Sequence, residues 1–561
     1  MEQPLNILWQ KGVSSDVYID IFDIRNNEFP LSAAKILVDG LYKGAKSSGL
    51  QKSDLNAKLV REQANAIFAQ GKYYDAMEQY NLAMSMAKNC RSEEFGLAIG
   101  NRASCFFNLN MIENCLADVQ LAKGTNYPKH LMHKLNEREI RCTKLMAKPQ
   151  FKSASHDIWE PTLSFNEHNE FAGVADCLKI KKNDRFGRHI VTTCDLKIGQ
   201  TILVERPYAA VPPRENEGRM RCWYCFKECM NFIPCKSCLC VIYCNEECME
   251  MSFHKMECNR PAALSRKETY ELIMRMIFKI NADFTDVDAL MDLVQLLIDG
   301  KKPPMNLTQS QKYFCALFQL VHHHKKVSAY GLERMRASAG IVILTTSRYP
   351  EFKRKYLSLK HKRFLQHLIL HLFHVAEHAI DMFEYFQKDT TAIIANYEYR
   401  HFARGMYPFA CYINHSCVPN ICWFHVDDRL VCKVIRPIKK GQQIFRSYFP
   451  GQNSYKQLPI LKLELQLRYH FECECMLCTN DDWSPLTDEV DFSDDPLYTI
   501  GMKPFCMTVK ELRKLSRSQI QQYEKNAIDF LVKYGRFHPV NDTMGMQNTL
   551  LIMWNVLAAR Q

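Results

Sequence analysis

Residues 414–420 read Asn-His-Ser-Cys-Val-Pro-Asn, and residues 469–478 read Tyr-His-Phe-Glu-Cys-Glu-Cys-Met-Leu-Cys. The second stretch carries three cysteines within six positions, and a larger cysteine block occupies residues 222–258. We expect no secretory signal, because Glu2 and polar residues stand where a basic and then apolar leader would begin. Clustered cysteines in such a sequence indicate metal-bound thiolates rather than disulfides, and therefore a reducing compartment.

Size and composition limit the class of protein. A chain of 561 residues is too long for one core and predicts roughly three or four domains. Hydrophobic residues make up 47%, so most of the chain should fold. We expect a soluble protein, because no stretch reaches the roughly 18 uncharged apolar residues of a membrane span. The net charge of +12 is modest for this length and does not indicate direct nucleic-acid binding.

Residues 54–146 show helical periodicity with an internal repeat. The pattern Ala64-Asn65-x-x-Phe68-x-x-Gly71-x-Tyr73-x-x-Ala76 places small and aromatic residues where two helices interlock, with glycine at the turn. A second unit follows around residues 101–118. Both resemble tetratricopeptide (TPR) repeats, whose unit is a helix pair of about 34 residues. The alternative is an ordinary helical hairpin.

Strand patterns follow a polar linker. They cover residues 175–180, 189–193 and 201–208, then return at 391–448, while residues 262–388 are largely helical in pattern. The pattern therefore predicts one β-domain that is interrupted twice, by the cysteine block and by a helical insert. The stretch 505–561 is again helical in pattern.

The cysteine block contains eight donors with the spacing of zinc ligands. Zinc binds four thiolate or imidazole groups tetrahedrally, so eight donors make two closed, structural sites. The order resembles the MYND zinc finger, whose ligand pairs interleave. By that resemblance one zinc is held by Cys222, Cys225, Cys244 and Cys248, and the other by Cys235, Cys238, His254 and Cys258. Cys229 and Cys240 are then spare thiols. MYND fingers also bind proline-containing peptides, so the block by itself does not indicate an enzyme.

The quoted stretches resemble the SET domain of lysine methyltransferases. Asn414–Asn420 matches the NHSCxPN motif, Ile438–Tyr448 the turn, strand and tyrosine that follow it, and Tyr469–Cys478 the post-SET segment. Lys181–Arg188 stands at the glycine-rich cofactor turn. The order of these motifs resembles the SET and MYND domain (SMYD) family, and the N-terminal repeats point to a subgroup that carries TPR units.

This resemblance implies an α+β architecture, a split SET β-fold with an inserted MYND finger and a helical insert, flanked by TPR-like and C-terminal helices. The implied parts are an N-terminal segment 1–53, TPR-like repeats 54–146, linker 147–172, first SET part 173–217, finger 218–261, helical insert 262–388, second SET part 389–452, post-SET 453–480 and a helical region 481–561.

The resemblance also implies a protein-lysine methyltransferase that uses S-adenosylmethionine. The lysine must be neutral to react, and at pH 7 removing its proton costs about 4–5 kcal/mol. The family uses a narrow apolar channel that disfavours the ammonium, with tyrosine hydroxyls that orient the amine. Tyr448 and Tyr469 match these catalytic tyrosines. The cofactor residues implied by the match are Lys182, Asn183, Arg185, Phe186, Gly187, Asn396, Asn414, His415, Tyr448 and Phe471.

A third zinc site is implied by Cys417 together with Cys473, Cys475 and Cys478, which would fold the post-SET segment over the channel. Two positions depart from the family pattern. Phe186 replaces a small or polar residue of the cofactor turn, and Gln442-Gln443 replaces an acidic residue. The alternative function is therefore a catalytically silent adaptor that uses its MYND and TPR surfaces.

Other features suggest partners and location. Arg61, Asn65, Asn101 and Lys129 stand where some TPR domains clamp the C-terminal carboxylates of chaperones. Helical spacing predicts that one helix face, rather than a metal-binding stripe, contains His367, His371, His374 and His378. The expected substrates are lysines of histone or non-histone proteins, and the expected location is cytoplasmic and nuclear.

Overall fold

The computed structural model describes residues 52–149, 151, 159–212, 221–239, 241–258, 268–320, 338–340, 342–343, 345–386, 399–449, 458–479, 491–538 and 540–558. The chain divides into two compact units. The helix–finger unit spans residues 41–158 and 212–266, and the sheet unit spans 159–211 and 267–560. None of the helices in the described ranges has the length and apolarity that a membrane crossing requires.

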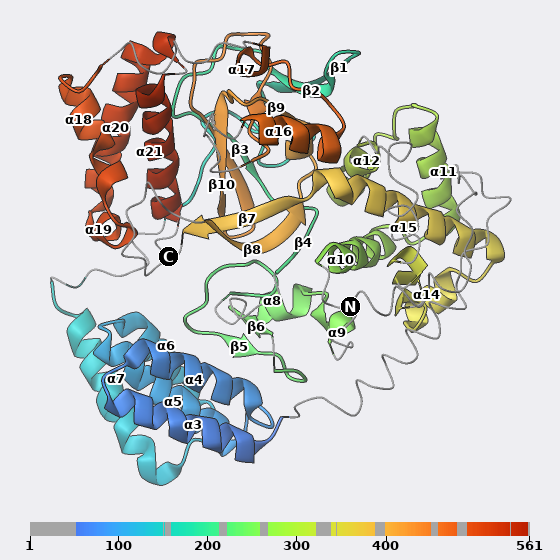
Figure 1. Cartoon of the computed structure of the whole chain (residues 1–561). Coiled ribbons are helices and arrows are strands. Elements are labelled where there is room, and N and C mark those ends of the chain that lie inside the picture. The colour runs from blue at the N-terminus through green and yellow to red at the C-terminus, as the bar shows by residue number, and fades with distance from the viewer. Residues whose placement is uncertain are drawn as a thin grey trace. The chain divides into compact units, whose positions relative to one another are not determined.

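The helix–finger unit begins with helices that pack in sequence order (Figure 1). They are α3 (Asp54–Ala69), α4 (Tyr73–Met86), α5 (Glu93–Asn108), α6 (Ile112–Lys123), the 3-10 turn η1 (Lys129–Leu131) and α7 (Met132–Met146). Gly71 connects the first two helices at φ 76°, a conformation that glycine adopts without strain. The helical character expected for residues 54–146 is confirmed.

Small side chains let these helices approach closely. Ala64, Ala76, Ala83 and Ala103 are fully buried between them. The Arg102 guanidinium on α5 binds both carboxylate oxygens of Asp118 on α6 at 2.7 Å, and both side chains are fully buried. A buried ion pair of this kind is tolerated because its hydrogen bonds are satisfied.

The cysteine block forms a small finger in the same unit. It contains β5 (Ile233–Pro234), β6 (Ile242–Tyr243), α8 (Glu246–Met251) and α9 (His254–Glu257). Its loop packs on the helices. Asn231 Nδ2 donates to Asp118 at 2.6 Å, and the Arg102 guanidinium lies 4.7 Å from the centre of the buried Phe232 ring. The finger and the helices therefore share one hydrophobic core.

The sheet unit contains two small antiparallel sheets (Figure 1). In one, β3 (Thr201–Glu205) pairs with β11 (Arg429–Val434), which pairs with β10 (Ile421–Val426). In the other, β4 (Ala209–Val211) and β7 (Asp381–Phe386) flank β8 (Tyr399–Met406). Strand β7 falls within the stretch whose pattern is helical in sequence. It is extended because β8 supplies its hydrogen-bond partners from a distant part of the chain.

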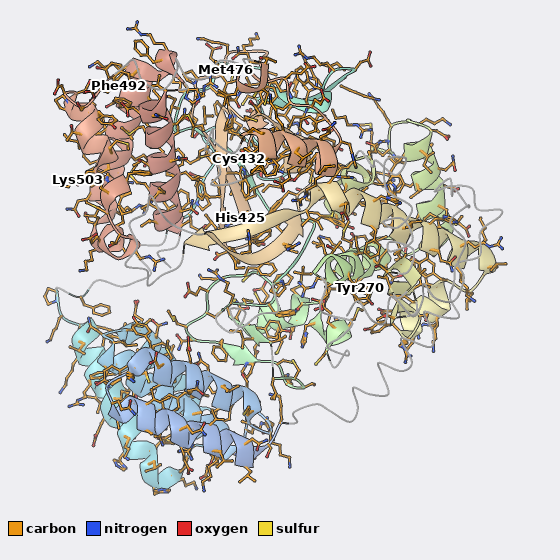
Figure 2. The ribbon with its side chains drawn as sticks, viewed as in Figure 1. Tyr270, His425, Cys432, Met476, Phe492 and Lys503 are labelled. Atoms are coloured by element: carbon orange, nitrogen blue, oxygen red, sulfur yellow. The ribbon has the colours of Figure 1, made fainter. Side chains whose placement is uncertain are left out.

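His425 on β10 lies in an aromatic part of this core (Figure 2). Its ring stacks on Phe383 with centroids 4.5 Å apart and an interplanar angle of 14°. Burial, with a smaller contribution from the Arg446 guanidinium, lowers the pKa of His425 to about 3. The ring is therefore neutral and packs as an aromatic residue.

Two further strand pairs contain residues of the cofactor turn and of the Asn414–Asn420 motif. Strands β1 (Leu178–Asn183) and β2 (Gly187–Thr192) form a hairpin. The short strands β9 (Asn414–His415) and β12 (Phe445–Arg446) pair in parallel. The sequence pattern starts the first strand at residue 175, and the structure starts it three positions later.

Helices cover both ends of the sheet unit. The insert contains α10 (Glu268–Asp283), α11 (Val287–Ile298), α12 (Gln309–Phe318), α14 (Pro350–Lys355) and α15 (Leu359–Ala379). The C-terminal group contains α18 (Pro496–Met502), η11 (Lys503–Cys506), α19 (Val509–Lys514), α20 (Arg517–Tyr534), η12 (Gly535–Phe537) and α21 (Asn541–Ala558). Trp554 of α21 stacks on Phe424 of β10 at 6.3 Å, which joins the C-terminal helices to the sheet. The helical C-terminal region expected from the sequence is confirmed.

Candidate active site

A cavity of about 900 Å³ opens in the sheet unit between the β1–β2 turn and residues 469–476. Its volume falls within the range of natural small-molecule sites. The remaining walls come from η7 (Ala410–Tyr412), β9 and residues 436–448. The quoted stretches of the sequence thus meet at one cavity.

The β1–β2 turn forms one lip of the cavity. The Asn183 side chain accepts a hydrogen bond from the Phe186 amide at 2.7 Å, and Gly187 follows at φ 59°. Asn414 Nδ2 donates to the Phe186 carbonyl at 2.9 Å, which fixes the turn to β9. The Phe186 side chain is 36% exposed and packs edge-on to Phe445 at 6.1 Å. It lines the cavity without filling it.

An ion pair spans the cavity mouth. Arg185 of the turn donates from Nε and Nη2 to Glu474 Oε2 at 3.0 and 2.7 Å. Both side chains are more than 60% exposed, so the pair contributes at most about 1 kcal/mol. It nevertheless connects the turn to the segment around Cys473–Cys475.

His415 links the cavity wall to a cysteine cluster. Its Nδ1 accepts a hydrogen bond from the Tyr448 amide at 3.0 Å, and its Nε2 lies 3.3 Å from Cys417 Sγ. Because a backbone amide only donates, Nδ1 carries no proton, so the neutral ring has its proton on Nε2, facing the sulfur. One imidazole therefore orients the Tyr448 backbone and a cysteine ligand together.

Tyr448 and Tyr469 stand side by side in the cavity, with ring centroids 4.6 Å apart. Tyr469 ends α16 (Leu458–Glu464) through the π-helical turn η9 (Leu465–Tyr469). Extra turns of this type re-aim a side chain and are frequent at functional sites. Phe449, Leu461 and Leu465 form the apolar cluster against which both tyrosines pack.

The structure brings together Cys417, Cys473, Cys475 and Cys478, the four donors expected for a third zinc site. Their donor atoms lie within 4.8 Å of one another. The short helix α17 (Met476–Thr479) supplies Cys478, whose amide donates to the Cys475 carbonyl at 2.8 Å. Hydrogen bonding from Cys417 lowers the pKa of Cys475 to about 6.

The finger holds two further donor groups with the interleaved membership expected from the sequence. One contains Cys222, Cys225, Cys244 and Cys248, and the other Cys235, Cys238, His254 and Cys258. All three groups offer four soft or borderline donors within 4.8 Å, which fits tetrahedral zinc and leaves no position for a substrate. Cys229 is buried beside the first group, and Cys240 lies outside the described residues.

Most of the sequence-expected cofactor residues meet at the cavity. Its lining includes Arg185, Phe186, Gly187, Asn414, His415, Tyr448, Tyr469 and Phe471. Lys182 and Asn183 lie on β1 outside that lining, and Asn183 acts on it through the Phe186 amide. Asn396 lies outside the described residues.

The cavity also has lining residues that the sequence interpretation did not assign to the cofactor site, although it named Cys473 and Cys475 as zinc donors and Gln442-Gln443 as a departure from the family pattern. They are Arg188, Leu320, His378, Ala379, Cys411, Tyr412, Ser416, Val418, Asn420, Arg436, Pro437, Gln442, Gln443, Phe445, Glu472, Cys473, Glu474, Cys475 and Met476. Several lie within a few sequence positions of the motifs, so closeness to a motif in the sequence could have identified them. Leu320 and His378 come from the helical insert, where no motif indicated a cavity.

The residues proposed for a carboxylate clamp are partly engaged with one another. Arg61 binds Glu94 at 2.7 Å, and Asn65 Oδ1 accepts from both Tyr80 and Asn101 at 2.8 Å. The charge of Arg61 is therefore balanced within the helices, while Lys129 is exposed. His367, His371 and His374 are buried on α15, in agreement with a helix face.

Comparison with known proteins agrees with this geometry. A family model described as "SET domain" matches residues 187–449. The chain is 22% identical to "Protein-lysine N-methyltransferase SMYD4" of Mus musculus, over 78% of this chain and 68% of that protein. It is 23% identical to the protein of the same name from Gallus gallus, over 75% and 72% of the two chains. It is also 25% identical to "Histone-lysine N-methyltransferase ASHR1" of Arabidopsis thaliana, over 54% and 55%.

Proposed function

Because this chain belongs to the SET and MYND domain family, SMYD4 type, we propose that it methylates lysine side chains of proteins with S-adenosylmethionine. The observation that carries the proposal is the pair Tyr448–Tyr469, 4.6 Å apart in a cavity bounded by Asn414 and His415. Paired phenol rings, an apolar cluster behind them and a polar wall opposite are the components that lysine methylation requires.

The cavity residues fit a sulfonium cofactor. When bound, S-adenosylmethionine supplies an electron-poor methyl group. Asn414 and the backbone at His415 would hold it on one side, and the turn of Arg185, Phe186 and Gly187 on the other. Lys182, Asn183 and Phe471 would support these walls, and Asn396 would bind the amino-acid end of the cofactor.

The tyrosines prepare the lysine. An ammonium that enters an apolar channel loses hydration, which lowers its pKa and favours the neutral amine. The hydroxyls of Tyr448 and Tyr469 then orient the nitrogen lone pair, and the packing of both rings on Phe449 keeps them rigid. We assign the catalytic role to these two tyrosines.

The three four-donor groups are proposed to hold structural zinc, about three ions per chain. The finger is proposed as a MYND module for proline-containing peptides, and helices α3–α7 as TPR repeats. Chaperone C-termini are proposed partners of Asn65, Asn101 and Lys129, although the Arg61–Glu94 pair reduces the positive charge offered. We also propose that the protein is located in the cytoplasm and the nucleus.

The second candidate is an adaptor without catalysis, and Phe186 is the observation that favours it. This ring stands at the lip of the cavity, where a small residue would leave more room. An adaptor would bind partner proteins through the finger and the helices, and its cavity would not catalyse methyl transfer.

Isothermal titration with S-adenosylmethionine and transfer of a labelled methyl group to lysine peptide arrays separate the two candidates. We expect binding by the wild type and by Tyr448→Phe, with transfer lost in the variant. Absence of wild-type binding, restored by Phe186→Gly, would identify the adaptor. Binding and transfer that are both unaffected by Tyr448→Phe would contradict the assigned site.

A further inference from the structure

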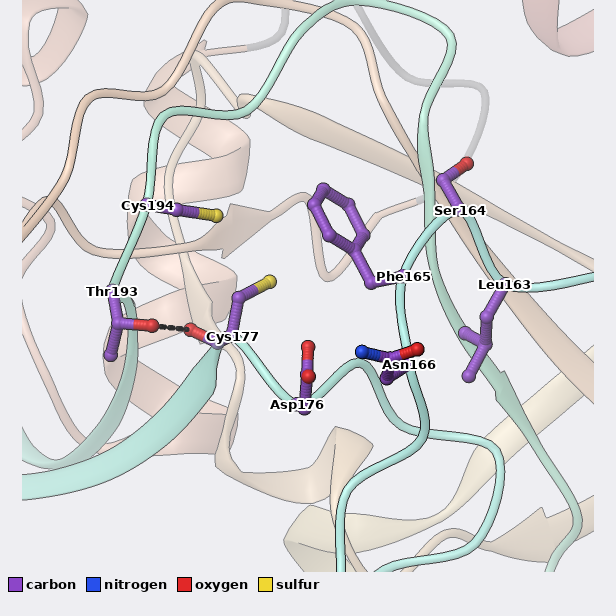
Figure 3. Close-up of a pocket in the computed structure, with 8 residues that line it drawn as sticks. All are labelled: Leu163, Ser164, Phe165, Asn166, Asp176, Cys177, Thr193 and Cys194. Atoms are coloured by element: carbon purple, nitrogen blue, oxygen red, sulfur yellow. Dashed lines mark hydrogen bonds between the residues drawn. The ribbon is translucent and has the colours of Figure 1, made fainter.

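A second, open pocket of about 620 Å³ lies in the sheet unit at the base of the β1–β2 hairpin (Figure 3). Leu163, Ser164, Phe165, Asn166, Asp176, Cys177, Thr193 and Cys194 line it. Cys177 directly precedes β1 and Cys194 follows β2 by two positions. Figure 3 shows both sulfur atoms directed into the pocket.

The hairpin holds these two cysteines together. The Thr193 amide donates to the Cys177 carbonyl at 2.8 Å, and the Thr193 hydroxyl donates to the same carbonyl at 3.1 Å. The Cys194 thiol is close enough to Cys177 to contribute, after burial, to the raised pKa of Cys177. Thr192 Oγ1 donates to the Cys194 carbonyl at 2.8 Å, which fixes the bend that carries the second thiol.

The two thiols differ in access and in chemistry. Cys194 is half-buried at the pocket, whereas Cys177 is only 6% exposed. Burial, with the neighbouring Cys194 next, raises the pKa of Cys177 to about 12. Since the thiolate is the reactive form, Cys194 is the group that meets an oxidant first.

We propose that Cys194 and Cys177 form a reversible disulfide when the protein encounters a peroxide. The Cys194 thiolate attacks one peroxide oxygen, so that an S–O bond forms, the O–O bond breaks and the released hydroxide leaves as water. The Cys177 sulfur then attacks the Cys194 sulfenic acid. The S–S bond forms, the S–O bond breaks, and the hydroxide leaves as water with the Cys177 proton. Two thiols are oxidised and one peroxide is reduced to two waters.

The disulfide would act on the cavity described above, a consequence that rests on the proposed function. The other end of this hairpin is the turn of Arg185, Phe186 and Gly187. The Thr192 backbone also exchanges hydrogen bonds with Gly441 and Gln442, and Gln442 lines the cavity. A bond that draws Cys194 toward Cys177 therefore pulls on both walls.

The chain contains a matched control. The sulfur atoms of Cys115 on α6 and Cys142 on α7 lie 3.5 Å apart, but both side chains are fully buried. If access at the pocket decides reactivity, peroxide leaves this pair reduced in the folded protein.

Zinc-loaded full-length protein would be treated with hydrogen peroxide below the dose that releases zinc, alkylated and mapped by mass spectrometry without reduction. We expect a linked peptide pair containing Cys177 and Cys194 that dithiothreitol removes, with Cys115 and Cys142 still alkylated. Cys177→Ser should leave a dimedone-reactive sulfenic acid at Cys194, and Cys194→Ser should leave Cys177 unmodified. Unlinked Cys177 and Cys194, or equal oxidation of the buried pair, would overturn the proposal.

Calorimetry with S-adenosylmethionine, before and after oxidation, tests the link to the cavity. We expect Kd to change at least threefold in the wild type and to stay constant in Cys194→Ser. Equal Kd in both wild-type forms would overturn the link. If neither the reduced nor the oxidised form binds S-adenosylmethionine, the proposed function is contradicted. The mapping experiment then still tests the disulfide independently.

Discussion

The finger contains two four-donor groups, and the third group consists of Cys417, Cys473, Cys475 and Cys478. The two regions differ in how far apart their donors lie in the sequence. Every donor of the finger comes from residues 222–258, whereas the third group joins Cys417 to Cys473, 56 positions later. The finger groups stabilise a local fold, while the third group joins two cavity walls and contacts His415. We therefore expect the same ligand chemistry to serve folding in one region and the assembly of the proposed active site in the other.

The largest expected effect comes from Cys417→Ser. The variant should lose one of about three zinc ions and more than about 1000-fold in methyl transfer, because the post-SET wall and Tyr469 lose their position together. Elemental analysis and a labelled-methyl assay measure both. Cys229→Ser is the control, since this buried cysteine belongs to none of the four-donor groups and should keep full zinc. Retention of activity after zinc loss would show that the third group is not part of the active site.

Tyr448→Phe should lower kcat by about 100-fold with little change in the Kd of the cofactor. The ring would still pack against Tyr469, and only the hydroxyl that orients the amine is removed. Single-turnover kinetics and calorimetry separate the two quantities. Equal losses in kcat and cofactor affinity would instead mean that the hydroxyl binds the cofactor.

His415→Ala should weaken cofactor binding about tenfold and destabilise the third zinc site, because the Tyr448 amide and Cys417 lose the same partner. His415→Asn is the informative comparison, since a side-chain oxygen can replace Nδ1 as acceptor but does not reach the sulfur. We expect it to recover cofactor affinity more than zinc retention, as measured by calorimetry and chelator competition. Identical behaviour of both variants would refute a bridging role.

Cys258→Ser should have the smallest effect on catalysis. It should remove one zinc ion and loosen the finger, yet change methyl transfer on a short peptide by no more than about twofold, because the finger and the cavity belong to separate compact units. Zinc analysis, limited proteolysis and the same methyl assay test this. A large loss of transfer would make the finger part of the catalytic machinery.

The sequence predicted those parts of the site in which a chemical requirement fixes the spacing of residues along the chain. Zinc needs four donors in reach, so the membership of all three groups followed from the cysteine pattern and the family resemblance. The Arg185–Glu474 pair, by contrast, joins ordinary residue types 289 positions apart. The bond from Asn231 to Asp118 spans 113 positions and has no motif. Strand β7 likewise depends on β8, which the local pattern of Asp381–Phe386 cannot show.

The insertion of the finger between β4 and α10 has a consequence for the order of folding. Strand β3 pairs with β11 although the paired residues Thr201 and Lys433 are 232 positions apart, so the β10–β11–β3 sheet closes only after the whole insert has been synthesised. The finger takes all its metal donors from residues 222–258, and the helices that share its core, α3–α7, precede it in the chain, so it is free to fold with its metal long before that. Pulse-labelled hydrogen exchange during refolding should therefore show early protection of the Trp223 and Cys235 amides, which donate to Ile242 and Val241, and late protection at Val431. During synthesis, the ribosome would thus release a finished metal-binding module while the methyltransferase core is still an open chain.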